Sequence, residues 1–98
     1  MIRVTVQDGV SKVVPDGSLD MGAITELQEV LERSALAGDV AVDLSGVTML
    51  SSSAIGALIA GHNALRARGR RLRIEGATDG IRHLLRLMGL DRHFDIAG

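Results

Sequence analysis

The chain has 98 residues, of which 46% are hydrophobic and 23% are charged. This is the composition of one small folded domain, so we expect a single domain over residues 1–98 and no extended disorder. The absence of cysteine excludes a disulfide scaffold and a thiolate metal site, and the formal net charge of −1 gives no overall attraction to nucleic acid.

The charge is distributed unevenly along the chain. Residues 1–50 carry three basic and eight acidic side chains, whereas residues 51–98 carry eight basic and four acidic ones. The two halves therefore have formal charges of −5 and +4. Because both halves must share one core, we interpret this difference as two differently charged faces of one domain.

The first predicted elements are two antiparallel strands. Residues 2–7 alternate apolar and polar side chains, which is typical of a half-buried strand. Asp8-Gly9 is a dipeptide favoured in two-residue hairpin turns, because both positions need a positive φ. Residues 10–14 form the predicted return strand, which ends at residues 15–17, Pro-Asp-Gly.

A helical pattern follows over residues 24–35, with apolar side chains on one side and mainly charged or amide side chains on the other. Two starts are compatible with the sequence. Asp20 could cap the helix, or Thr25 and Gln28 could form a capping box. Gly38 is expected at the carboxyl end of this helix.

The middle of the chain predicts a buried strand at residues 40–44, broken by Ser45-Gly46, and a helix between the serines at 51–53 and Gly69. Residues 44–65 contain no Asp, Glu, Lys or Arg, which is long enough for a membrane span. However, strand and loop backbone would be unpaired in lipid. We therefore expect a buried unit of strand, loop and helix, without membrane insertion.

The remaining elements are a strand at residues 71–75, a helix that begins at Thr78-Asp79-Gly80 and stops at Gly89, and a tail over residues 90–96. Strands thus alternate with helices after the hairpin. This order predicts an α/β fold with a mixed sheet, in which right-handed crossovers join parallel strands.

Several candidate sites have simpler interpretations. The Arg-rich segment 66–73 is expected to be a solvated helix end and strand face, or else a surface for an acidic partner. Gly56 and Gly61 have the spacing of a phosphate loop, but His62 stands where that motif needs lysine. The three histidines lack metal-ligand spacing, and there is no G-x-S-x-G elbow. We predict no catalytic residue, metal or cofactor.

Serines 51–53 are the most informative feature. They follow an apolar strand and loop and open an amphipathic helix, where a hydroxyl can cap backbone N–H groups. One cap needs only one serine. The two additional hydroxyls make this segment the best candidate for a functional site.

At this segment the chain resembles a known family. The run of residues 42–56, VDLSGVTMLSSSAIG, is similar to the signature of STAS domains, specifically of anti-sigma factor antagonists. In that family, a strand ending in Asp-Leu-Ser leads to Asp-Ser-Ser-Gly-Leu-Gly at a helix start. Residues 17–20, GSLD, resemble the family's Gly-Glu-Leu-Asp, and residues 89–96 are similar to its usual ending. The resemblance implies a STAS-type domain: a mixed sheet of four to five strands, opened by an N-terminal β-hairpin and packed by three to four helices.

The same resemblance implies the site residues. The family's phosphorylated serine falls on Ser53, and Ser52 is the alternative acceptor. Ser51 stands where the family has aspartate, and Ala54 stands where it has glycine. The implied partner-binding residues are Asp20, Ser51, Ser52, Ser53, Ala54, Gly56 and Ala57.

The function implied is that of a binding module switched by phosphorylation, and not that of an enzyme. Unmodified, the protein would bind an anti-sigma factor that is also a serine kinase, and so free the sigma factor. Phosphorylated, it would release this partner until a serine phosphatase restored it. The first ten residues lack the apolar segment of a signal peptide, so we expect a cytoplasmic protein, a monomer or weak dimer.

Two other functions stay open on the sequence. The first is a cytoplasmic STAS subunit or regulator of an ABC-type lipid transport complex, some of which lack phosphorylation. Ser51 in place of aspartate favours this alternative. The second is an interaction domain that keeps the fold without the switch.

Overall fold

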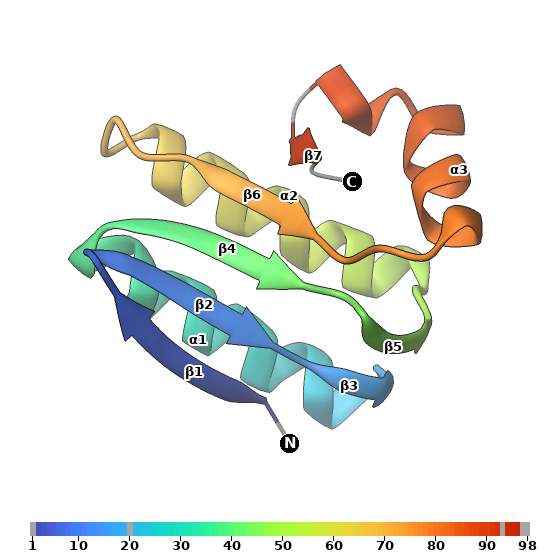
Figure 1. Ribbon diagram of the computed structural model, residues 1–98, viewed down its shortest axis with the longest axis horizontal. Coiled ribbons are helices and arrows are strands. Elements are labelled where there is room, and N and C mark those ends of the chain that lie inside the picture. Colours follow the sequence, from blue (N-terminus) through green and yellow to red (C-terminus); the bar gives the residue numbers. More distant parts are fainter. Residues whose placement is uncertain (1, 20, 93, 97–98) are drawn as a thin grey trace.

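The computed structural model describes residues 2–19, 21–92 and 94–96. The predicted hairpin, helices and longer strands follow one another in the predicted order, and three short strands are present that the sequence does not predict (Figure 1). In chain order the elements are β1 (Arg3–Gln7), β2 (Val10–Val14), β3 (Asp16–Ser18), α1 (Met21–Ala37), β4 (Asp39–Asp43), β5 (Gly46–Met49), α2 (Ser52–Arg66), β6 (Leu72–Glu75), α3 (Asp79–Leu87), the 3₁₀ helix η1 (Leu90–Arg92) and β7 (Asp95–Ile96).

The main sheet has five strands in the order β1-β2-β4-β6-β7. β1 pairs with β2 in antiparallel fashion, and the other neighbours are parallel. Figure 1 shows α1 and α2 together behind this sheet, with α3 beyond the end of β6. The predicted mixed sheet, opened by a hairpin and packed by helices, is confirmed.

The core lies between the sheet and the two long helices. Inward-facing side chains of the central strands, such as Val13, Val42 and Ile74, are fully buried. Leu31 of α1 and Leu58 of α2 are buried opposite them. The core is aliphatic, because the apolar residues of the chain are almost all Leu, Ile, Val, Ala and Met.

The hairpin turn forms as predicted, but its first strand is not half-buried as predicted. Asp8 and Gly9 have φ angles of 54° and 78°, the left-handed values that a two-residue primed turn requires. All five residues of β1 are exposed, and Val6 keeps 67% of its surface accessible. The expected half-burial is therefore wrong. The reason is position: β1 is an edge strand, and α1 packs on β2 and β4.

A second, two-stranded sheet is present where the sequence predicts only turns. β3 and β5 pair in parallel, with Asp16 opposite Gly46 and Gly17 opposite Val47. Asp16, Gly17 and Gly46, which the sequence predicts as turn residues, thus belong to these short strands. Strands of three and four residues are too short for a hydrophobic period to reveal them.

The ends of α1 differ from the expectation. Asp20 lies outside the described residues. Thr25 lies within the helix, where its Oγ1 donates a hydrogen bond to the Met21 carbonyl oxygen at 3.1 Å, so it does not begin a capping box. Gly38 follows the helix as expected, but its φ is not positive. A glycine is needed there because a Cβ atom would overlap the carbonyl oxygen of Gly9.

The predicted strand at residues 40–44 is present as β4, and the predicted helix after the serines is present as α2. The charge-free stretch of residues 44–65 begins just after β4 and contains most of α2, together with β5, which was not predicted. α2 has 15 residues. Among the described residues, no helix has the length and apolarity needed to cross a membrane.

Candidate functional site

The three α-helices begin at the same end of the main sheet, where its parallel strands terminate. The carboxyl ends of the parallel strands β2, β4 and β6 lie on the same side of the sheet, and α1, α2 and α3 begin beyond them (Figure 1). In open parallel sheets, ligands and partners commonly bind at the carboxyl ends of the strands. The serine segment therefore lies at the edge where a binding site is most expected.

The turn between β4 and β5 is held by Asp43. Its Oδ1 accepts a hydrogen bond from the Ser45 backbone N–H at 2.9 Å, and its Oδ2 lies 3.6 Å from Nζ of Lys12. Hydrogen bonds from the Ser45 side chain and backbone, with the charge of Lys12, lower the pKa of Asp43 below its ordinary value, although burial opposes them. Gly76 borders this turn, since a Cβ there would lie 2.8 Å from Asp43 Oδ1. The contacts of Asp43 with Ser45 and Lys12 thus hold the turn that leads toward the serines.

Ser51 is the cap of α2. It has φ −77° and ψ 165°, outside the helical region, and its side chain accepts a hydrogen bond from the Ala54 backbone N–H at 3.2 Å. Its carbonyl oxygen accepts the first bond of the helix, from Ile55 N–H at 3.0 Å. Ser51 thus supplies the side-chain cap of this helix.

Ser52 and Ser53 are the first two residues of α2, and both are exposed. Within the described part of the chain, neither hydroxyl forms a hydrogen bond with another protein group. The expected position of Ser53, at the amino end of the middle helix, agrees with the structure. Its hydroxyl is open to solvent.

The other predicted site residues separate into two groups. Gly56 is exposed one turn after Ser53, and a Cβ there would meet no atom within 4 Å. Ala54 and Ala57 are buried, at 0% and 1% exposure, so a partner cannot reach their side chains in this fold. The structure therefore brings Ser51, Ser52, Ser53 and Gly56 together at the surface, whereas the two alanines pack into the core.

Two exposed methionines near this site were not identified by the sequence analysis. Met49 ends β5, two residues before the helix cap, and is 65% exposed. Met21 begins α1 and is 76% exposed. The pairing of β3 with β5 places residue 18 opposite Met49, and so brings the start of α1 toward the serine segment. Flexible, polarisable methionine side chains suit adaptable binding surfaces. Their only sequence signal was apolarity, which also fits the core.

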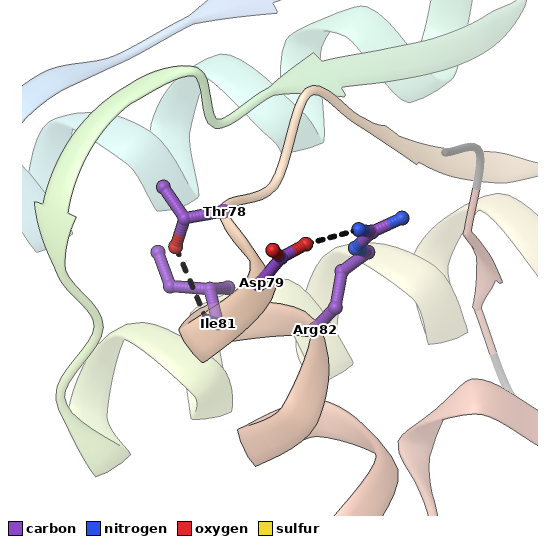
Figure 2. A network of polar contacts seen from close by, with 4 residues as sticks. All are labelled: Thr78, Asp79, Ile81 and Arg82. Atoms are coloured by element: carbon purple, nitrogen blue, oxygen red, sulfur yellow. Dashed lines mark hydrogen bonds and ion pairs between the residues drawn. The ribbon is translucent and has the colours of Figure 1, made fainter.

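The start of α3 shows a different arrangement. Figure 2 shows Thr78 accepting a hydrogen bond from the Ile81 backbone N–H, at 3.2 Å, and Asp79 paired with Arg82. The predicted start at Thr78-Asp79 is confirmed. Asp79 supplies negative charge to the first turn of α3, whereas the first turn of α2 has no acidic residue. The positive end of the α2 dipole is therefore not neutralised by a neighbouring carboxylate in its first turn.

Comparisons with known proteins agree with this fold. A family model described as "Mlab, STAS domain" matches residues 2–97. The anti-sigma-B factor antagonist of Staphylococcus aureus (strain NCTC 8325 / PS 47) is 33% identical over 91 residues, which cover 91% of this chain and 84% of that protein.

Solved structures have a similar fold. An anti-sigma factor antagonist from Mycobacterium paratuberculosis aligns with a TM-score of 0.78 and 27% identity, over 98% of this chain and 83% of that one. An anti-sigma-factor antagonist (STAS) domain protein from Planctomyces limnophilus aligns with a TM-score of 0.81 and 16% identity, over 97% and 87%. The chain belongs to the STAS domain family. Within that family, its resemblance to the anti-sigma factor antagonists is confirmed.

Proposed function

We propose that this protein is an anti-sigma factor antagonist whose binding is switched by phosphorylation of Ser53. The observation that supports this most is the division of roles at the start of α2. Ser51 caps the helix, which leaves the exposed hydroxyl of Ser53 available for modification. The proposed unit is a single STAS domain over residues 1–98, which acts by binding and carries no catalytic residue.

The fold should tolerate a phosphate at this position. A phosphoserine carries about −1.5 to −2 charges at neutral pH. The N–H groups and dipole at a helix amino end favour an anion by roughly 0.3–1 kcal/mol. The first turn of α2 contains no acidic residue that would repel it. Phosphorylation is therefore expected to leave the free energy of unfolding nearly unchanged.

A docked partner would respond differently. The proposed docking surface consists of Ser52, Ser53 and Gly56, with Met21 and Met49 as its apolar contacts. A new, strongly hydrated charge inside such a contact can cost several kcal/mol, and each 1.4 kcal/mol is about tenfold in affinity. The proposed partners are an anti-sigma factor with serine kinase activity, which dissociates on phosphorylation, and a serine phosphatase. Such regulators act beside the transcription machinery, so we place the protein in the cytoplasm.

Incubation with candidate serine kinases, followed by intact-mass spectrometry, tests the switch. The wild type should gain one phosphate, Ser53→Ala should gain none, and the matched control Ser52→Ala should still be modified. In addition, Ser53→Asp should weaken binding of the anti-sigma factor at least about tenfold, with an unchanged unfolding curve. Phosphorylation of Ser53→Ala to the wild-type extent, or equal affinity of Ser53→Asp and wild type, would contradict the proposal.

A second function uses the same surface without phosphorylation: a subunit or regulator of an ABC-type lipid transport complex. The observation that favours it is the pair of departures at Ser51 and Ala54 from the antagonist signature. Neighbouring genes separate the two functions, because a serine kinase gene supports the switch and transporter genes support the complex. Co-purification with transporter subunits that Ser53→Ala leaves intact would assign the second function.

A further inference from the structure

Four of the eight arginines in the second half of the chain line one cavity. This cavity has a volume of about 580 Å³ and lies at the carboxyl end of α2, away from Ser53. Its charged lining residues are Arg66, Arg70, Arg71, Arg92 and Asp95. Four arginines and one aspartate thus line the cavity, in a protein whose overall charge is −1. Packing of the hydrophobic core does not explain why four arginines line one cavity.

The cavity is built from segments that are distant in sequence. Arg66 ends α2, and Arg70 and Arg71 precede β6, while Arg92 ends η1. The parallel pairing of β6 with β7, which sets Arg73 opposite Asp95, carries η1 to this position. Arginines from the α2–β6 segment and from η1 therefore line the same cavity.

The apolar floor of the cavity is fixed by packing. Leu72 and Phe94 line it, and both side chains are buried. The ring of His62 packs edge-on against Phe94, with ring centroids 5.5 Å apart and an interplanar angle of 89°. A packed floor keeps the surrounding arginines on a defined frame.

Most of these arginines are not neutralised by the protein. Arg70 donates a hydrogen bond to the Ala35 carbonyl oxygen, so it is held in place. Asp39 accepts the backbone N–H of Arg71 at 2.9 Å, which leaves that guanidinium group unengaged by this contact. Within the described part of the chain, Arg66, Arg71 and Arg92 form no ion pair.

The end of α2 accounts for only part of this charge. A helix carboxyl end carries about half a negative charge, which cations complement. Here the last carbonyl groups are already bonded: Leu65 accepts from the N–H groups of both Arg68 and Arg70, each at 2.9 Å. A net lining charge of +3 therefore exceeds what the helix dipole can balance.

We propose that this cavity binds a small molecule that bears phosphate groups with at least two negative charges. Guanidinium groups bind phosphate oxygens with paired hydrogen bonds, which lysine cannot reproduce. The volume lies within the range of about 300–1,000 Å³ that is common for small-molecule sites. Because α2 rises about 1.5 Å per residue, this site is roughly 20 Å from Ser53 and is independent of the proposed switch.

Titration of the ¹⁵N-labelled full chain with inorganic pyrophosphate, followed by NMR, tests this site. Saturable shifts are expected at the amides of residues 66–72 and of Phe94. Arg71→Gln and Arg92→Gln should each weaken binding about tenfold, because each removes a charge-assisted contact. The matched control is Arg68→Gln, since Arg68 is exposed on the same segment but does not line the cavity. Its affinity should equal that of the wild type.

Three results would overturn the proposal. The first is an absence of saturable shifts in the millimolar range together with an absence of binding to phosphatidylglycerol vesicles. The second is shifts confined to Ser52 and Ser53, which would mean binding at the amino end of α2. The third is equal weakening by Arg68→Gln and Arg71→Gln, which would indicate only general charge attraction.

Phosphate groups also occur in lipid headgroups, so a second arm uses sedimentation with phosphatidylglycerol vesicles. Pyrophosphate binding without sedimentation assigns the cavity to soluble phosphates. Sedimentation that Arg71→Gln abolishes and Arg68→Gln preserves assigns the same cavity to headgroups. Binding in neither arm refutes the site.

Discussion

The three consecutive serines occupy three different positions in one helical turn, and Ser51 alone is tied to the backbone through Ala54. Replacement of Ser51 by alanine should lower the free energy of unfolding by about 1 kcal/mol, because the Ala54 N–H loses its acceptor. The matched control Ser52→Ala removes a hydroxyl that is outside this bond and should change stability little. Urea unfolding followed by circular dichroism measures both. Equal stability of Ser51→Ala and wild type would contradict this assignment of the cap.

Asp43 gives the protein a specific dependence on pH. Its pKa is lowered in the folded state, first by hydrogen bonds from Ser45 and then by Lys12, so its ionised form stabilises the fold. This stabilisation is complete above the unfolded pKa, about 3.9, and is lost as the pH falls through the lower folded value. Asp43→Asn should therefore be less stable than wild type at pH 7, and the difference should shrink toward zero in acid. A stability difference that stays constant or grows as the pH falls would be inconsistent with this role.

Single residues also show what sequence can and cannot reveal. Thr78-Asp79-Gly80 was predicted as a helix start and Asp8-Gly9 as a turn, since both depend on local backbone chemistry. Met21 and Met49 were not predicted to be exposed, because an apolar residue does not itself indicate which side of the fold it faces. The role of Gly38 was also different from the expected one, since it depends on a turn almost thirty residues earlier.

At the scale of elements, the contact between α1 and α2 depends on a small residue. A Cβ at Gly61 would lie 2.7 Å from Cδ1 of Leu31, and Leu31 is buried. Gly56, one and a half turns earlier on α2, has open space at the same position. Gly56→Ala should therefore raise the free energy of unfolding by about 0.5–1 kcal/mol through helix propensity.

Gly61→Ala gains the same propensity but must displace Leu31, so it should be less stable than Gly56→Ala by about 1–3 kcal/mol. Chemical unfolding of the two variants side by side measures this difference. Because the propensity gain is common to both, the comparison isolates the packing of the two helices. Equal stability of the two variants would show that Leu31 moves aside freely.

Elements differ in how well the sequence predicts them. α2 and β6 show a clear periodicity and were predicted, as was the parallel order of the strands that follow the hairpin. β3 and β5 were not, because each is stabilised by the other and neither has a pattern of its own. For β1, the alternation was correct but the burial was wrong, since alternation does not show whether a helix covers the apolar side.

At the scale of the whole molecule, α2 connects two surfaces of different character. Its amino end presents Ser53 with no acid in the first turn, and its carboxyl end presents Arg66 to the arginine-lined cavity. The separation of roughly 20 Å exceeds the Debye length of about 8 Å at physiological ionic strength. The two proposed binding events should therefore be independent.

This independence is measurable in both directions. Ser53→Asp should leave pyrophosphate affinity unchanged, and Arg71→Gln should leave anti-sigma factor affinity unchanged, each within a factor of about two at 0.15 M salt. Titration calorimetry of each variant with each ligand gives the four values. A reciprocal loss of affinity would mean that α2 couples its two ends.

The short parallel pair β3–β5 has a consequence for recognition. Its backbone hydrogen bonds join the strand before α1 to the strand before α2. Met21 and Ser53 therefore follow two paired strands and not two separate loops. A partner that contacts both residues does not have to immobilise either segment, and so loses little conformational entropy on association. In the proposed switch, this preorganisation would allow a small surface to bind firmly and still be released by a single added charge.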